Sequence, residues 1–349
     1  MQEIIIGSNQ AGQRLDKFLH KYLPEASGSF LYKMLRKKNI LLNGKKAAGG
    51  ELLKEGDAVK LFFADETLNK FRGLSLSDSL SGENEPQSLW SSSITGLSKS
   101  CWEAYCRLKG ITVIYEDPHV LILNKPAGIL TQKAKADDLS LNEWMIGYLL
   151  ENNILNEDSL HTFRPSVLNR LDRNTSGLVI CGKSLAGSQE LSRLIHDRVI
   201  RKFYRTVVTG EIREGMVLNG SLIKNHITNK VSVQPGPASG EAAQITTIYT
   251  PVSVGNQLTL LEVELITGKT HQIRAHLASI NHPIIGDTKY GDPSCNLVWK
   301  RHYHLLYQLL HAYRLEFPQL NGVLAGLSGR KITAPIPKRM EQIIKGKGL

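Results

Sequence analysis

Asn169-Arg170-Leu171-Asp172-Arg173-Asn174-Thr175-Ser176-Gly177, followed at once by Leu178-Val179-Ile180, joins a polar loop directly to an apolar run. The run predicts a buried strand, and Gly177 permits a sharp turn into it. We therefore expect Asp172 to be held in an irregular loop beside the start of that strand. Arg170 and Arg173 would keep its carboxylate ionised at neutral pH, which suits a nucleophile better than a general acid. Taken alone, a carboxylate in such a turn is more often a surface ion pair without a function.

Two further stretches each place a polar residue on a predicted strand or helix. Residues 201–210 alternate apolar and polar side chains and predict a strand that bears Tyr204. In the second stretch, residues 265–278, Arg274 falls on a predicted helix, and Ile273, Leu277 and Ile280 give that helix an apolar stripe beside it. Considered separately, Tyr204 is typical of a strand tyrosine packed across a sheet, and Arg274 of a helix-surface arginine.

Together these stretches closely resemble the motifs of the RluA-type pseudouridine synthases, which convert uridine in RNA into its C-glycoside isomer. The resemblance runs from about residue 111 to residue 344 and includes residues 124–128, 281–291 and 334–337. The loop of that family most often begins with His where this chain has Asn169, but the following Arg-Leu-Asp is intact.

The resemblance implies roles for four side chains. Asp172 matches the catalytic aspartate, Tyr204 the aromatic residue that stacks on the target base, and Arg274 the arginine that pairs with the aspartate. Arg170 matches a residue that holds the flipped-out nucleotide. The resemblance also implies a central sheet with the active-site cleft across its middle.

These residue types suit the isomerisation on chemical grounds. The N1–C1′ bond of uridine must break, the base must rotate and a C5–C1′ bond must form, with no electron or external group, so we expect no cofactor. An ionised Asp172 can attack C1′, add to C6 or assist loss of a C2′ proton, and the sequence leaves all three routes open. The ring of Tyr204 would hold the detached uracil and still let it rotate. The charge of Arg274 would keep the carboxylate ionised in a closed site.

Other kinds of site are disfavoured. Residues 268–270 look like the end of a phosphate-binding P-loop, but Val263 stands where that pattern requires Gly. His271 and His276 lack the spacing of a helical zinc site, and the four cysteines form no Cys-x-x-Cys pair, so we expect no metal and ordinary thiols. A glycoside hydrolase would need a second carboxylate beside Asp172, and the motif stretches supply none.

The charge balance favours an RNA partner. With 43 Lys and Arg against 32 Asp and Glu, the formal net charge is +11. This excess indicates a polyanionic partner, nucleic acid before membrane. No run approaches the ~18 apolar residues of a membrane span, and the first residues lack the features of a signal peptide. We expect a cytoplasmic protein.

A serine-rich stretch divides the chain. Residues 65–100 contain ten serines interspersed with Gly and Pro. Such a composition cannot bury enough apolar surface to order itself, and it predicts a flexible linker. The linker would separate a compact basic unit, residues 1–64, from a catalytic domain, residues 101–349.

Residues 1–64 resemble the S4 RNA-binding domain. Apolar periodicity predicts two helices, around residues 15–23 and 31–35, and short strands at 40–42 and 59–63 with an Asn43-Gly44 turn. A lysine run on a helix is most often a solvated face, but beside an RNA-modifying domain it favours phosphate contacts with little sequence discrimination. The residues assigned to RNA binding are Arg14, Lys33, Arg36, Lys37, Lys38, Asn43 and Lys45.

Residues 101–349 predict an α+β domain on a mixed, largely antiparallel sheet. A helix is expected from residue 184 to about residue 197, with Ser184 as its N-cap. The expected strands are residues 111–115, 120–123, 177–181, 203–208, 244–249 and 258–266, the first two paired as a hairpin.

We therefore expect a pseudouridine synthase that acts on a uridine flipped out of its stack. The combination of an S4 domain with this catalytic domain resembles the large-subunit ribosomal RNA branch of the family, so structured ribosomal RNA is the expected substrate. Transfer RNA is the alternative within the same chemistry. A non-catalytic RNA-binding or ribosome-assembly factor is the alternative class, against which the intact Asp172, Tyr204 and Arg274 argue. We expect a monomer.

Overall fold

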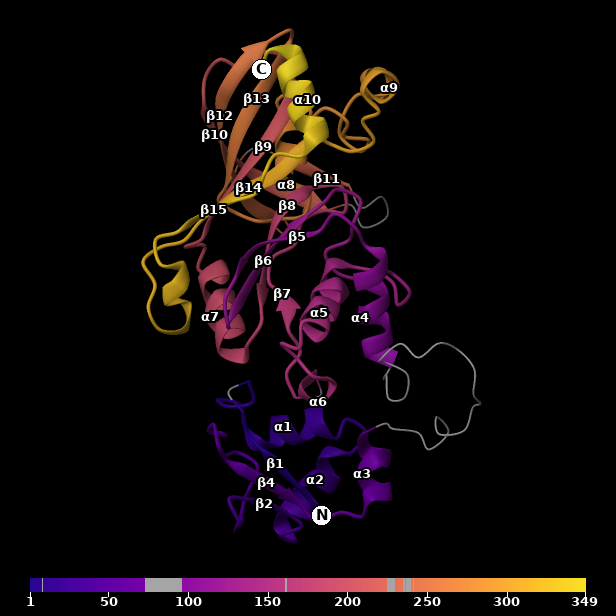
Figure 1. Ribbon diagram of the computed structural model, residues 1–349. Helices are drawn as coiled ribbons and strands as arrows, with labels where there is room; N and C mark the ends of the chain where they lie inside the picture. Colours follow the sequence, from indigo (N-terminus) through magenta and orange to yellow (C-terminus); the bar gives the residue numbers. More distant parts are fainter. Residues whose placement is uncertain are drawn as a thin grey trace, which may run out of the picture.

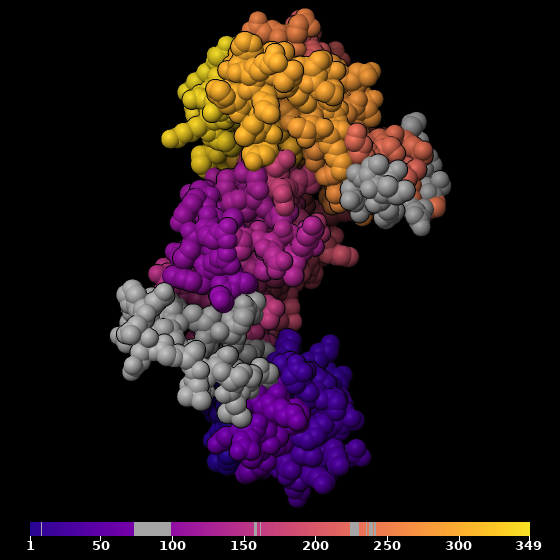
Figure 2. Space-filling model, turned by 90° about the vertical axis from the view of Figure 1, so that its right-hand side faces the viewer, coloured from indigo at the N-terminus to yellow at the C-terminus, as the bar shows by residue number. Residues whose placement is uncertain are grey.

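The computed structural model describes residues 1–7, 9–72, 96–160, 162–224, 230–234, 236, 240 and 242–349. These residues form two bodies, one around a four-stranded sheet and one around an eleven-stranded sheet. Figure 1 shows the small N-terminal unit below the larger one, and Figure 2 shows it as the indigo lobe at one end of the molecule. The expected α+β class, with a small α+β unit ahead of a mixed sheet, is confirmed.

The N-terminal unit packs two amphipathic helices on its sheet. Its elements are β1 (Gln2–Ile5), α1 (Leu15–Tyr22), α2 (Gly28–Arg36), β2 (Ile40–Leu42), β3 (Lys45–Lys46), β4 (Ala58–Leu61) and α3 (Asp65–Arg72). The strands pair in the order β1-β4-β2-β3. Asn43 and Gly44 have φ values of 52° and 72°, the left-handed geometry of a two-residue hairpin turn. That turn joins β2 to β3, which the sequence did not predict, while β4 pairs with the other edge of β2.

The expected linker is too long at both ends. Residues 65–72 form α3, whose Leu68 is buried in the same core as α1 and α2 and whose Arg72 guanidinium lies 4.4 Å from the centre of the Tyr22 ring. At the other end, α4 (Gly96–Arg107) begins inside the predicted linker. At the first end, Leu68 and Phe71 supply core contacts that the serine-rich composition of the stretch concealed. Residues 73–95 lie outside the described residues, so the flexible linker stays a prediction there.

The large sheet has the strand order β11-β10-β12-β13-β9-β14-β8-β6-β5, with β7 paired to β8 and β15 paired to β14. Its pairs are antiparallel except for β8 and β14, which run parallel. The strands are β5 (Thr112–Glu116), β6 (Val120–Lys125), β7 (Ser166–Val167), β8 (Ser176–Gly182), β9 (Arg201–Thr209), β10 (Met216–Lys224), β11 (Val231–Gln234), β12 (Ala243–Gly255), β13 (Leu258–Leu265), β14 (Leu310–Glu316) and β15 (Lys331–Thr333).

Helices cover both faces of this sheet (Figure 1). Side chains alternate along a strand, so Val179 and Cys181 of β8 pack in the core that contains α4 and α5, while Leu178 and Ile180 pack with α7. In the other half, α8 packs on one face and α10 on the other. The remaining helices are α5 (Leu141–Glu151), α6 (Glu157–Leu160), α7 (Leu185–His196), α8 (Gln272–Ser279), α9 (Pro293–Tyr303), the 3-10 helix η2 (Gly322–Leu327) and α10 (Lys338–Lys347).

Each strand and both helices predicted for the catalytic domain are present. The hairpin of β5 and β6 is confirmed, and Ser184 caps α7 by accepting a hydrogen bond from the Gly187 N–H at 3.0 Å. The structure adds strands β10 and β14 and helices α4, α5, α9 and α10, which the sequence did not predict. In α5 seven of eleven residues are buried, so it lacks the polar face that would mark an amphipathic helix.

Candidate active site

Asp172 lies in the loop between β7 and β8, as predicted, and its carbonyl accepts a hydrogen bond from the Thr175 N–H at 3.0 Å. Gly177, the second residue of β8, is paired on both sides, to Lys125 of β6 and to Ala312 of β14. It has a φ of 119°, and a Cβ atom there would stand 2.2 Å from the Ala312 carbonyl oxygen. Only glycine fits at this position, because a side chain would force β14 away from β8.

A buried arginine connects two carboxylates. Arg274, in the first turn of α8, donates from Nη1 to Asp172 Oδ2 at 2.8 Å. Its Nε and Nη2 donate to Asp287 Oδ2 and Oδ1 at 2.7 and 2.9 Å. The side chain of Arg274 is 7% exposed and that of Asp287 is 0% exposed. The expected pairing of Arg274 with Asp172 is therefore present, and Arg274 is a core residue rather than a surface one.

The charges of this triad support one another. Burial lowers the pKa of Arg274, but the hydrogen bonds and charges of Asp287 and Asp172 outweigh it and leave the pKa raised. Burial likewise raises the pKa of Asp287, but Arg274 and two backbone N–H groups outweigh it and leave the pKa lowered. Those N–H groups belong to Lys289 and Tyr290. Arg274 is thus held rigidly, with one guanidinium nitrogen presented to Asp172.

The loop arginines do not play the part that the sequence suggested. The ion-pair contacts of Asp172 run to Arg274 and, at 3.8 Å, to His271 Nε2. Arg170 and Arg173 are exposed, and neither pairs with Asp172 within the part of the chain that the structure describes. The described residues thus show no direct contact through which either arginine would act on Asp172, where the sequence had suggested one. Both still line the rim of the cavity above Asp172.

His271 faces Asp172 from the start of α8. It has left-handed backbone angles, φ 55° and ψ 15°, which are uncommon for a non-glycine residue. Its Nδ1 lies 2.9 Å from the hydroxyl of Tyr290, which accepts the Val231 N–H at 2.9 Å. Burial lowers the pKa of His271, and the charge of Asp172 opposes part of this shift. The site therefore contains a largely neutral imidazole beside the carboxylate.

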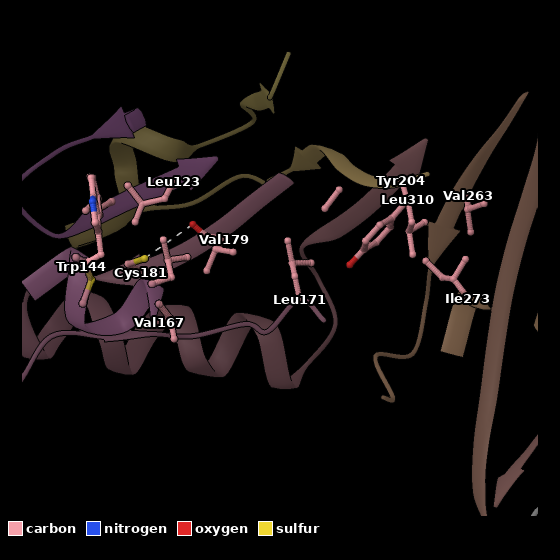
Figure 3. Close-up of a cluster of buried hydrophobic side chains, with 14 of the residues drawn as sticks. Leu123, Trp144, Val167, Leu171, Val179, Cys181, Tyr204, Val263, Ile273 and Leu310 are labelled. Carbon is pink, nitrogen blue, oxygen red and sulfur yellow. Dashed lines mark hydrogen bonds between the residues drawn. The ribbon is translucent and has the colours of Figure 1, made fainter. Parts of the chain in front are cut away.

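Tyr204 comes from β9 and is 6% exposed. Figure 3 shows it grouped with Leu310, Val263 and Ile273 at one end of the large core. Burial raises the pKa of its hydroxyl well above the ordinary value, and the charge of Asp172 adds to the shift, so the side chain is neutral. The part of Tyr204 that is accessible lines the same cavity as Asp172 and Arg274.

The cavity has a volume of about 400 Å³, which suits a ligand of nucleoside size. It lies near the middle of the sheet, between the loop that precedes β8, the strands β9 and β14, and the N-terminus of α8. Its lining residues are Leu130, Thr131, Gln132, Arg170, Leu171, Asp172, Arg173, Thr175, Tyr204, Leu265, Gly268, Lys269, Thr270, His271, Gln272, Ile273, Arg274 and Leu310.

Lys125 binds the backbone of the loop that contains Asp172. It ends β6, is fully buried, and donates from Nζ to the carbonyls of Pro126, Ile129 and Arg173 at 3.0, 2.8 and 3.0 Å. Burial lowers its pKa to about 7, and the negative charge of Asp172 opposes part of that shift. The sequence placed Lys125 in a motif but assigned it no role.

The sequence also missed His271, Asp287 and Tyr290 as members of this site. Asp287 follows the apolar run Ile284-Ile285, and an acidic residue that close to a buried run signals a paired charge. Tyr290 places its ring 5.2 Å from the guanidinium of Arg274. His271 carries no comparable signal, because its position depends on backbone angles that a sequence does not display.

The N-terminal basic residues lie on the surface, apart from this cavity. Lys33, Arg36, Lys37, Lys38 and Lys45 are all exposed. Two of the assigned residues have structural partners instead. Arg14 pairs with Asp16 at 2.7 Å, and the amide of Asn43 binds the Asp57 carboxylate and the Ala58 N–H, both at 2.8 Å.

Within the described residues, no group of three or more His, Cys, Asp or Glu side chains is placed to hold a metal ion. None of the described helices combines the length and the apolar character needed to cross a membrane. All four cysteines are free thiols.

Comparison with known proteins identifies the family. A family model described as RNA pseudouridylate synthase matches residues 119–279, and the S4 domain model matches residues 13–59. An uncharacterized RNA pseudouridine synthase of Mycoplasma pneumoniae is 30% identical over 341 residues, which cover 95% of this chain and 94% of that protein. The ribosomal large subunit pseudouridine synthase C of Vibrio vulnificus is 27% identical, covering 99% of this chain and 96% of that protein.

Among solved structures, human RNA pseudouridylate synthase domain containing 4 superimposes with a TM-score of 0.53 at 19% identity, covering 71% of this chain and 96% of that one. This likeness bears on the fold alone. The sequence relatives place the chain in the RNA pseudouridine synthase family. The protein is thus an isomerase that acts on uridine in RNA, with an S4 domain at its N-terminus.

Proposed function

We propose that this enzyme isomerises uridine in large-subunit ribosomal RNA, with Asp172 as the group that acts on a base flipped out of its stack. One observation carries the proposal. Asp172 is fixed by Arg274 at 2.8 Å in the wall of a cavity of nucleoside size that Tyr204 also lines. A stacked nucleotide cannot bring its glycosidic bond to a carboxylate in such a cavity, so the base must leave the helix.

The geometry fits each of the routes open to a carboxylate. Asp172 is 24% exposed, so its free oxygen can reach C1′, C6 or the C2′ hydrogen of a bound uridine. The positive charge of Arg274 balances the negative charge of the carboxylate. Its Nε and Nη2 are bound to Asp287, so Arg274 stays in its position and does not occupy the cavity. The exposed Arg170 and Arg173 at the rim are placed to contact the phosphates that flank the target.

Ribosomal RNA is favoured over transfer RNA by the extent of the similarity. The large-subunit enzyme of Vibrio vulnificus matches 99% of this chain, so the match includes the S4 unit as well as the catalytic domain. An S4 unit with exposed Lys33, Arg36, Lys37, Lys38 and Lys45 adds an anchoring surface that a large structured RNA can fill.

The test is release of tritium from 5-tritiated uridine, because C5 loses its hydrogen once it is bonded to C1′. We would compare large-subunit ribosomal RNA transcripts with bulk transfer RNA. Release from ribosomal RNA supports the proposal, and release from transfer RNA alone moves the substrate to the alternative. Salt-sensitive RNA binding with no release from either RNA would leave a binding or assembly factor as the better account.

Replacing Tyr204 tests the stacking role. Tyr204→Leu removes the aromatic face, and we expect kcat/KM to fall about 5- to 150-fold, which corresponds to the ~1–3 kcal/mol of a base–aromatic stack. Tyr204→Phe keeps the face and should retain most of the activity. Tyr249→Leu is the matched control, since Tyr249 is 4% exposed in the same core but does not line the cavity. Equal losses in the Phe and Leu variants would assign the role to the hydroxyl instead.

Replacing two N-terminal cations tests the anchoring surface. Lys33→Ala/Arg36→Ala removes two exposed charges of α2, and the slope of log K against log salt concentration should become shallower by about 2. Filter binding to ribosomal RNA between about 50 and 200 mM salt measures this slope. Arg339→Ala/Lys345→Ala on the exposed side of α10, at the far end of the molecule in Figure 1, should leave the slope unchanged. An equal change in both double variants would mean that net charge alone matters.

A further inference from the structure

The peptide groups on both sides of Asp172 are held by one neighbouring segment, residues 125–131. On the N-terminal side, Thr131 Oγ1 donates to the Leu171 carbonyl at 2.8 Å and accepts from the Leu171 N–H at 3.2 Å. On the C-terminal side, the Arg173 carbonyl accepts from the Gly128 N–H at 2.9 Å and from Lys125 Nζ at 3.0 Å. The position of Asp172 is thus fixed by hydrogen bonds to the backbone of Leu171 and Arg173, while its own carboxylate faces the cavity.

This segment is itself well anchored. Lys125 pairs with Gly177 in the ladder between β6 and β8. At the other end, the Leu130 carbonyl accepts the Leu141 N–H at 2.8 Å, and the Thr131 carbonyl accepts the Asn142 N–H at 3.2 Å. Those two N–H groups belong to the first turn of α5, so Thr131 is fixed to the end of a buried helix. A constraint placed on Leu171 by Thr131 is therefore a constraint against the core of the domain.

A side-chain hydroxyl at residue 131 does what a strand backbone would do elsewhere. It binds both the N–H and the carbonyl of Leu171. Leu171 is 7% exposed and Thr131 is 3% exposed, so both residues are buried. Valine has nearly the same shape but can neither donate nor accept, so it would leave both groups of Leu171 without that partner. The loop would then be free to shift relative to Arg274, which is anchored separately by Asp287.

We infer that Thr131 is a positioning residue, which sets the place of the Asp172 carboxylate by binding both the backbone N–H and the backbone carbonyl of Leu171. This inference rests on the proposed role of Asp172. Displacement of a reacting group by about 1 Å can lower a rate about 10²-fold without changing the binding of the substrate. Thr131 therefore acts on the rate of the chemical step and not on affinity for RNA.

The structure supplies a matched control. Thr259 of β13 is fully buried, and its hydroxyl bridges backbone groups in the same way, accepting from the Ile212 N–H at 2.9 Å and donating to the Gly210 carbonyl at 2.8 Å. Val263, the strand partner of Tyr204, lies four residues further along β13. Thr259 is therefore ~13 Å from Val263 along the strand. Thr259→Val thus imposes the same chemical loss at a distance from Asp172.

The experiment compares Thr131→Val, Thr131→Ser and Thr259→Val in the full chain. We expect Thr131→Val to lower kcat for tritium release about 10²-fold with KM and RNA affinity nearly unchanged. Thr131→Ser keeps the hydroxyl and should restore most of the rate. Thr259→Val should lower the unfolding temperature as much as Thr131→Val does while keeping kcat. Equal losses of kcat in the two valine variants, or a serine variant as slow as the valine one, would overturn the inference.

A second readout separates this inference from the proposed function. Amide hydrogen exchange of the peptide that spans residues 168–176 should become faster in Thr131→Val and stay unchanged in Thr259→Val. If the natural chain releases no tritium from either RNA, the proposed substrates fail, and this exchange result still decides whether Thr131 holds the loop. Unchanged exchange in Thr131→Val overturns the inference whatever the activity.

Discussion

Asp172→Asn is expected to reduce turnover by at least about 10⁴-fold, to the limit of a tritium-release assay. The substitution keeps the size of the side chain and an oxygen that can accept from Arg274, but it removes the negative charge and most of the nucleophilicity. RNA affinity should stay close to that of the natural chain, because the cations proposed to contact phosphate are untouched. Single-turnover release from 5-tritiated ribosomal RNA, with filter binding alongside it, measures both quantities.

Asp197→Asn is the control for this substitution. Asp197 also pairs with an arginine, Arg193, at 3.4 Å, but it lies at the end of α7 and is 42% exposed. It should keep the activity of the natural chain. An Asp172→Asn enzyme that turns over at the natural rate would show that another group attacks the nucleotide, and the neutral imidazole of His271 at 3.8 Å would then be the first residue to replace.

Asp287→Asn is expected to have the largest effect on stability. Asp287 is fully buried and binds two nitrogens of Arg274, so its neutralisation leaves a buried guanidinium with Asp172 as its remaining acidic partner. Breaking a buried ion pair by removing one partner costs about 3–5 kcal/mol. Activity should fall as well, because Arg274 would no longer be held in place. Calorimetric unfolding of the full chain and tritium release measure the two effects.

A paired substitution separates these two effects. Arg274→Met/Asp287→Leu removes both buried charges and fills the space with apolar groups, so most of the stability should return while activity does not. Glu341→Ala breaks an exposed pair with Lys345 and should hardly change the unfolding temperature. A double variant as unstable as Asp287→Asn would mean that the shape of this region, and not its unpaired charge, determines the loss.

The same carboxylate predicts a pH dependence. The folded-state pKa of Asp287 lies below its ordinary value of 3.8. A group whose pKa is lowered by folding stabilises the protein fully above its unfolded-state pKa, and that stabilisation is lost as the pH falls through the folded-state pKa. The difference in unfolding temperature between the natural chain and Asp287→Asn should therefore be widest near neutrality and narrow below about pH 4.

Much of the local structure was predictable because it depends on neighbouring residues. The apolar run after Gly177 predicted β8, the serine at 184 predicted the start of α7, and alternation over residues 201–210 predicted β9. The helices that the sequence missed fail for a physical reason as well. α5 is buried on most of its surface, so its residues show no polar face from which a helical period could be recognised.

The ion pair of Asp172 could not be predicted from the residues next to it in the sequence. Arg170 and Arg173 are its nearest cations in sequence, yet both are exposed and neither forms an ion pair with it among the described residues. The cation that pairs with it is Arg274, 102 residues away. Sequence proximity favours ion pairs along a helix or a turn, whereas partners across a sheet depend on the order of its strands.

The sequence by itself determined that Asp172 lies in a polar loop before a buried strand, that the N-terminal unit is basic, and, through the resemblance of several motifs, which chemistry the chain performs. The resemblance also implied that Arg274 pairs with Asp172, and the tertiary structure alone decided which other residues hold Arg274 and the loop in place. The parallel pairing of β8 with β14 and the position of α8 bring Arg274, His271 and Asp287 to the loop, and the end of β6 brings Lys125 and Thr131 beneath it. These contacts join segments far apart in the chain, and their geometry exists only once the whole sheet has formed, because no local interaction specifies it.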